Sequence, residues 1–217
     1  MKELLTIYDT LLKFFGGQGW WPAETPFEVV VGAVLTQNTA WRNVERAIEN
    51  LKEAGVLTPQ GLMRINESSL AGLIRPAGYY NVKAQRLKHL MNFLHEEYGG
   101  DLERMFTEPL SSLRGKLLAV NGVGPETADS ILLYAGEKPI FVVDAYTRRV
   151  LFRHGMITDG ASYGDIQGLF MRSLPQDVAL YKEYHALLVR LAKTFCKTKP
   201  LCAECPVEDG WPISNEK

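Results

Sequence analysis

Apolar residues recur along most of the chain at the three-to-four-residue spacing of amphipathic helices. Near the start, Leu4, Leu11 and Phe15 fall on one such face, and similar segments continue as far as residues 180–191. No stretch alternates at period two for long enough to predict a strand, and the short run 140–143 is the best candidate for one. The pattern predicts an all-α protein of about ten helices.

Composition changes this picture little. With 217 residues, of which 46% are hydrophobic and 23% charged, the chain is typical of a soluble globular protein of one domain or two packed lobes. The net charge of -1 gives no sign of a nucleic-acid partner, although backbone donors can bind phosphate on a neutral protein. The apolar runs are too short to span a membrane, and the N-terminus has no signal-peptide layout, so we expect a cytoplasmic protein.

The most informative segment is residues 118–128, where an apolar helix end meets a Gly-x-Gly turn and a new helix begins with Pro125. Glycines tolerate tight turns and close approach of another backbone. The N-terminus of the second helix directs backbone N–H groups and partial positive charge outwards, which predicts a phosphate site. An ordinary connection between two helices is the alternative. The residues expected at the phosphate are Gly122, Val123, Gly124, Glu126 and Thr127.

An aspartate, Asp144, follows three apolar residues and stands twenty residues after Gly124. One interpretation is that Asp144 is merely the N-cap of the next helix and has no other role. A carboxylate held ionised beside a phosphate site would also suit cleavage of an N-glycosidic bond. It would stabilise the oxocarbenium-like sugar that the departing base leaves, and it could deprotonate the attacking water.

Four motifs in order resemble the helix-hairpin-helix DNA glycosylases of the endonuclease III superfamily. They are the hairpin at 118–128, the VVD-x-x-x-x-R-V pattern within 141–150, the LTQNT segment at 35–39 and the RPAGYYNVKA segment at 75–84. The resemblance covers nearly the whole chain. It implies that the protein removes damaged bases from double-stranded DNA, and that Asp144 is the catalytic carboxylate.

The resemblance also implies an all-α, two-lobed fold with the active site in the interlobe cleft. One lobe would comprise residues 1–25 and 137–217, and the other, a helical barrel containing the hairpin, residues 26–136. We expect a monomer associated with the nucleoid.

Position 126 bears on the type of glycosylase. Family members with lyase activity carry a lysine there, whose amine forms a Schiff base with the sugar. Glu126 cannot form one, which predicts a monofunctional enzyme that removes the base with water. A lysine elsewhere, such as Lys138, could still act.

Three tryptophans, Trp20, Trp21 and Trp41, flank the LTQNT segment. They could simply pack in the core, but stacked indoles also attract the positive charge of an alkylated purine. The W-W-P loop and the other motifs look most like the endonuclease-III-like 3-methyladenine DNA glycosylases, in which the base would stack between the equivalents of Trp21 and Trp41. Two alternatives remain: a glycosylase for oxidised, deaminated or mismatched pyrimidines, with or without lyase activity, and a non-catalytic DNA-binding protein.

The resemblance implies that Gln37 enters the duplex as a wedge that fills the space left by the flipped base. Asn38 could do this instead, or both residues could cap the next helix. Tyr79 and Tyr80 are candidates for a second wedge, or they could simply pack against the protein. Lys83 and Arg86 lie one helical turn apart, where they could contact phosphate or remain on the solvated surface.

All three cysteines, Cys196, Cys202 and Cys205, lie near the C-terminus, which argues against a disulfide framework. The family's 4Fe-4S loop has four cysteines, and the fourth position here is Trp211. A cluster with an outside ligand, a zinc site completed by a histidine, and a metal-free loop stay open. His185 is expected to be a packed histidine.

Overall fold

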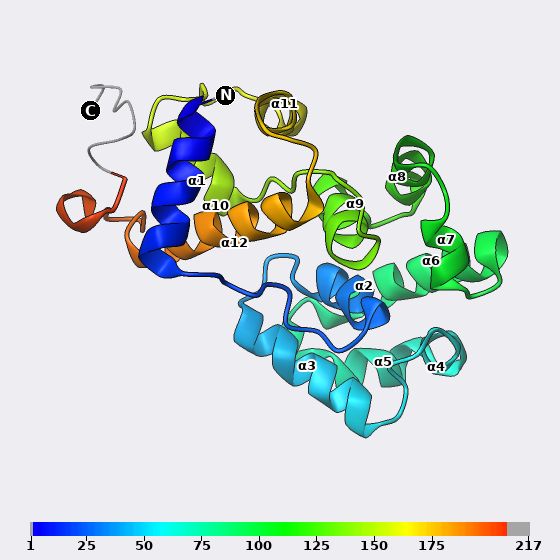
Figure 1. The fold of residues 1–217 in the computed structure, drawn as a ribbon. Coiled ribbons are helices and arrows are strands. Elements are labelled where there is room, and N and C mark those ends of the chain that lie inside the picture. Colours follow the sequence, from blue (N-terminus) through cyan, green and yellow to red (C-terminus); the bar gives the residue numbers. More distant parts are fainter. Residues whose placement is uncertain (1, 208–217) are drawn as a thin grey trace. The chain divides into compact units, whose positions relative to one another are not determined.

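The computed structural model describes residues 2–207, and Trp211 lies outside this range. The chain divides into two compact units, one made of Met1–Pro22 and Pro139–Lys217, the other of Ala23–Lys138. The described residues form helices and contain no strand, as expected of an all-α protein (Figure 1). The run at 140–143 is buried but has no regular secondary structure, so it is not a strand.

The first unit is built around α12. Its helices are α1 (Lys2–Phe15), α10 (Ala145–Arg153), α11 (Tyr163–Ser173) and α12 (Val178–Thr194), followed by the short turn η3 (Cys202–Glu204). Helix α12 packs against both α10 and α1, which lie far apart in the sequence (Figure 1). Aromatic rings fill the centre: Phe141 stacks on Phe170 with centroids 3.8 Å apart, and Tyr184 meets both rings edge-on.

The second unit surrounds α2. Its helices are α2 (Pro26–Leu35), α3 (Trp41–Glu53), α4 (Pro59–Arg64), α5 (Glu67–Leu73), η1 (Arg75–Ala77), α6 (Tyr80–Tyr98), α7 (Leu102–Phe106), α8 (Leu110–Ala119), α9 (Pro125–Ser130) and the π-helical turn η2 (Ile131–Ala135). Every residue of α2 after its first is buried, and the helix contacts α3, α6 and α9. Thr25 caps α2 by accepting from the N–H of Glu28 at 3.1 Å.

A buried lysine joins three segments of the second unit. The side chain of Lys83 is 1% exposed, and its Nζ donates to the carbonyls of Leu35 and Ala77, each at 2.8 Å, and to Thr39 Oγ1 at 2.6 Å. Burial lowers the pKa of Lys83 to about 8. Both expectations for Lys83, a phosphate contact and a solvated surface position, are therefore wrong. The lysine instead ties the ends of α2 and η1 to α6.

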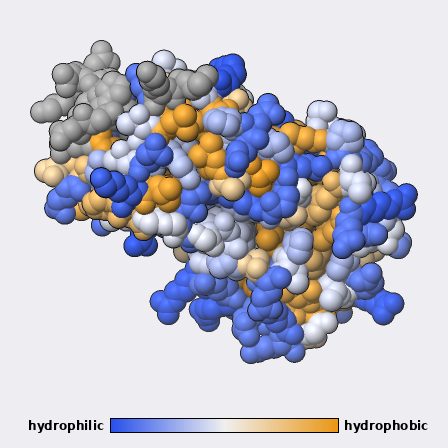
Figure 2. All heavy atoms as spheres, in the orientation of Figure 1, coloured by the Kyte–Doolittle hydropathy of each residue, from blue (hydrophilic) through white to orange (hydrophobic). Residues whose placement is uncertain are grey.

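Hydrophilic side chains cover most of the face drawn in Figure 2, with apolar patches between them. The exposed large apolar residues include Phe14, Tyr79 and Phe152, and Tyr79 is the most exposed of them at 74%. No helix within the described residues is long and apolar enough to cross a membrane.

Candidate active site

The predicted hairpin forms between α8 and α9 in the second unit. Gly122 has φ +91°, and a Cβ there would lie 2.2 Å from Arg86 Cγ, so only glycine fits. Gly124 differs, because its φ of -91° is open to any residue and a Cβ would meet nothing within 4 Å. Of the two glycines, only Gly122 is therefore required by a close approach, because the turn there lies against Arg86 of α6.

The end of the hairpin has the chemistry of a phosphate site. Helix α9 begins at Pro125, and its first turn directs backbone N–H groups out of the helix end. Gly124 and Glu126 are exposed there, whereas Val123 and Thr127 are buried. Residues 124–126 are thus the part of the predicted set that is exposed to solvent.

The amide of Gln37 is tied to this hairpin. Its Nε2 donates to the carbonyl of Gly122 at 3.0 Å and to Thr127 Oγ1 at 2.9 Å. Its Oε1 accepts from the guanidinium of Arg86. Arg86 therefore contacts both Gly122 and Gln37, and Gln37 links the end of α2 to the hairpin turn, to α9 and to α6.

Asn38 occupies a different position from its neighbour. It is exposed and has a left-handed backbone, with φ +51°. The next residue, Thr39, donates from Oγ1 to the carbonyl of Ala77 at 2.5 Å, which anchors the turn that carries Asn38. The two predicted wedge residues thus differ: the Gln37 side chain is engaged within the protein, and Asn38 lies at the surface of an anchored turn.

Asp144 in the first unit is the N-cap of α10. Its Oδ1 accepts from the N–H of Thr147 at 2.7 Å, and its side chain is only 12% exposed. Burial alone would raise the pKa of this carboxyl, but the nearby His185 and the hydrogen bonds from Thr147 outweigh burial and lower it. The carboxylate is therefore held ionised in a largely buried place.

His185 lies beside this carboxylate. It comes from α12, its side chain is 8% exposed, and its Nε2 is 3.6 Å from Asp144 Oδ2. The expectation of a packed histidine describes its burial but misses this partner, because no local pattern links positions 41 residues apart.

The tryptophans occupy two units. Trp20 and Trp21 belong to the first unit, where their rings lie 5.2 Å apart and tilted by 45°. Trp41 is the first residue of α3 in the second unit. All three side chains are half-buried, so none is simply a core residue.

The C-terminal loop is held by arginines of α10. Arg149 donates to the carbonyls of Cys196 and Ala192 at 2.8 and 3.2 Å, and Arg153 donates to the carbonyl of Lys197 and approaches Cys196 Sγ at 3.4 Å. Cys196 is buried and Cys202 exposed. Among residues 2–207, no three His, Cys, Asp or Glu side chains come together in a group that could hold a metal ion.

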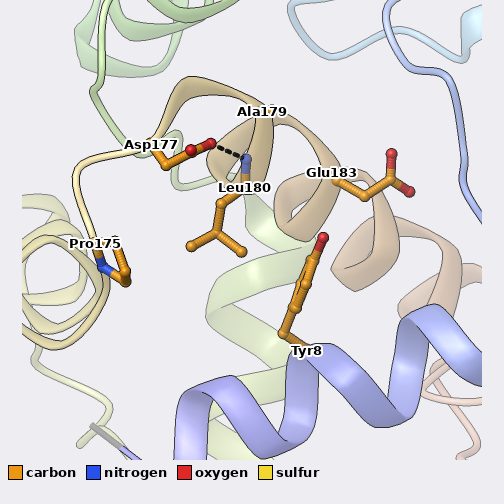
Figure 3. Close-up of a pocket in the computed structure, with 6 residues that line it drawn as sticks. All are labelled: Tyr8, Pro175, Asp177, Ala179, Leu180 and Glu183. Carbon is orange, nitrogen blue, oxygen red and sulfur yellow. Dashed lines mark hydrogen bonds between the residues drawn. The ribbon is translucent and has the colours of Figure 1, made fainter.

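A hollow of about 490 Å³ opens on the first unit between α1 and the start of α12 (Figure 3). It is lined by Tyr8, Pro175, Asp177, Ala179, Leu180 and Glu183. Asp177 caps α12 by accepting from the N–H of Leu180 at 2.7 Å. Burial, Glu183, Asp9 and Asp177 together raise the pKa of Tyr8. The two acidic side chains, Asp177 and Glu183, give this hollow a negative charge.

Comparisons with known proteins show the family of this chain. Residues 31–176 match the HhH-GPD superfamily of base excision DNA repair proteins. "Putative DNA repair glycosylase MJ1434" of Methanocaldococcus jannaschii is 52% identical over 96% of this chain and 98% of that protein. Endonuclease III of Thermotoga maritima is 32% identical, over 83% of this chain and 79% of that protein.

Among solved structures, the H. pylori 3-methyladenine DNA glycosylase bound to 1,N6-ethenoadenine matches with a TM-score of 0.72 and 31% identity. The match covers 88% of this chain and 94% of that chain. Family membership goes against the non-catalytic alternative. The chain belongs to the HhH-GPD superfamily and is a DNA glycosylase of base excision repair.

Proposed function

We propose that this glycosylase hydrolyses the N-glycosidic bond of alkylated purines such as 3-methyladenine in duplex DNA, without strand cleavage. The observation that carries the proposal is the Asp144 carboxylate, which is largely buried and held ionised at the start of α10. The likeness to a 3-methyladenine DNA glycosylase supports the choice of substrate.

In this mechanism an alkylated purine, already positively charged, departs with the bonding electrons and becomes neutral. The Asp144 carboxylate stabilises the oxocarbenium-like sugar through its fixed negative charge. Water then attacks the anomeric carbon, and the carboxylate takes its proton. Because the base leaves readily, one carboxylate suffices and no separate acid is needed for the leaving group.

The hairpin supports a reaction without a Schiff base. Glu126 stands where a lyase needs its lysine. Lys138 Nζ donates to the carbonyl of Glu108 at 2.7 Å, and Lys83 is buried on three acceptors. An amine must be free and deprotonated to attack the sugar, so neither lysine is suited to that role.

The proposed base-stacking residues are Trp21 and Trp41, and the ring of Trp20 lies 5.2 Å from that of Trp21. An indole face attracts a cationic ring by about 0.5–2 kcal/mol. Aromatic walls also accept oxidised or mismatched pyrimidines, which makes pyrimidine lesions the second candidate substrate.

Release of free bases from defined duplexes tests the substrate. We expect Trp21→Leu and Trp41→Leu each to slow release of 3-methyladenine by about 2- to 30-fold, which is the rate equivalent of a lost cation–π contact. Release of uracil or thymine glycol in preference to methylpurines would overturn the alkylpurine assignment and favour the second candidate.

The contacts of the wedge turn support a division of roles in which Asn38 enters the duplex and Gln37 fixes the hairpin. Asn38 is exposed at φ +51°, whereas both ends of the Gln37 amide are engaged by Gly122, Thr127 and Arg86. Tyr79, 74% exposed and also left-handed at φ +46°, is the proposed second wedge.

The pair Gln37→Ala and Asn38→Ala separates these roles. We expect Asn38→Ala to slow base release from a paired lesion by about tenfold, since unstacking costs a few kcal/mol, and to leave release from single-stranded DNA unchanged. We expect Gln37→Ala to weaken binding of damaged and undamaged duplex alike. If Gln37→Ala instead slows base release from paired lesions only, and not from single-stranded DNA, then Gln37 is the wedge.

A further inference from the structure

The two oxygens of the Asp144 carboxylate face two different helices of the first unit. Oδ1 accepts from the N–H of Thr147, which belongs to the first turn of α10. Oδ2 faces Nε2 of His185 on α12 at 3.6 Å. A carboxylate that serves only as an N-cap needs the first of these contacts, so the histidine requires its own explanation.

We propose that His185 is a positioning residue for base excision: from α12 it fixes the orientation of the Asp144 carboxylate and keeps it charged. This inference rests on the proposed catalytic role of Asp144. His185 does not touch the substrate in this account, and its effect reaches the reaction through Asp144 alone.

The surrounding helices show why His185 is the residue that can do this. Helices α10 and α1 pack against α12. On α10, Arg149 donates to the carbonyls of Cys196 and Ala192, near the C-terminal end of α12. Glu183 of α12 accepts from the N–H of Gln18, and α1 presents the ring of Tyr8 to Tyr184.

The groups that act on the Asp144 carboxyl are thus His185 and Thr147. Thr147 is tied to the cap geometry of α10 and holds one oxygen only. Without His185, Oδ1 of Asp144 would still be held by Thr147, but Oδ2 would lose its neighbour. A misplaced reacting group can cost a rate factor of about 100.

Two replacements of His185 test the inference, with Asp144→Asn as the reference. Phenylalanine keeps an aromatic ring but has no donor, and glutamine keeps a neutral N–H donor. We expect His185→Phe to slow single-turnover release of 3-methyladenine by about 10- to 100-fold and His185→Gln to recover most of that loss.

The pH profile distinguishes positioning from packing. Because His185 lowers the pKa of Asp144, removing it raises that pKa. Activity needs the ionised carboxylate, so the acid limb of the rate profile should move to higher pH in His185→Phe and less in His185→Gln. A side chain that only fills space would leave the limb where it is.

Thermal unfolding of each variant shows whether it folds, and His185→Gln carries the test if His185→Phe does not. Folded variants with the wild-type rate and an unmoved acid limb would overturn the inference, provided that Asp144→Asn is inactive. If Asp144→Asn itself retains activity, the proposed catalytic role of Asp144 is wrong, and the inference about His185 is wrong with it. The activity of Asp144→Asn therefore distinguishes this failure from a failure of the His185 inference alone.

Discussion

Replacing Asp144 by asparagine is expected to reduce release of 3-methyladenine by about 10²- to 10⁴-fold. The amide has the size of the carboxylate but carries no charge to stabilise the sugar cation and takes no proton from water. Its oxygen can still accept from the N–H of Thr147, which the aspartate does at 2.7 Å, so α10 keeps its cap. Single-turnover kinetics on a duplex with one lesion measure the effect.

Binding provides the control for this variant. We expect Asp144→Asn to bind duplex DNA containing an abasic-site analogue about as tightly as the wild type, because the hairpin and wedge turn belong to the other unit. Loss of binding in parallel with activity would mean that the substitution disturbs the fold. Retention of more than about a tenth of the rate would contradict the catalytic assignment, since general base catalysis alone contributes about 10² or more.

Replacing Lys83 by methionine is expected to lower the free energy of unfolding by about 2–5 kcal/mol. The methionine side chain keeps much of the apolar stem but cannot donate a hydrogen bond. The carbonyls of Leu35 and Ala77 therefore lose their donor, at a residue that is only 1% exposed. Each buried acceptor without a donor costs about 1–3 kcal/mol. Unfolding in urea, followed by circular dichroism, measures the loss.

Lys88 offers a matched control on the same helix. Its Nζ donates to the carbonyls of Leu62, Met63 and Ile65 at the end of α4, but the side chain is only half-buried. Water can replace these contacts, so we expect Lys88→Met to cost less than half as much as Lys83→Met. Equal losses would show that burial of the Lys83 acceptors is not what makes that lysine important.

The parts of the fold that the sequence predicts well are those with local signals. The Gly-x-Gly turn at 122–124, followed by a proline in the first turn of a helix, marks the hairpin without any knowledge of its neighbours. Asp144 likewise reads as an N-cap from its place before a helical segment, and the structure confirms the cap. Chain-local rules suffice there because the partners lie within a few residues.

The contacts that sequence reasoning missed join distant positions. Lys83 and Arg86 share one helix, yet one is buried on three acceptors and the other covers Gly122 and holds Gln37. Nothing in a helical pattern distinguishes them, because the difference depends on which segments pack against that helix. His185 is missed for the same reason: its partner lies on another helix.

Covalent trapping during the reaction tests most directly the claim that this glycosylase works with a carboxylate and water. The protein is incubated with a 3-methyladenine duplex in the presence of sodium borohydride, and both free base and protein–DNA adducts are quantified. We expect stoichiometric release of 3-methyladenine and no adduct, and in a parallel reaction without borohydride we expect strand breaks that appear only after alkali. A reduced adduct on a lysine, formed as fast as the base is released, would contradict the account.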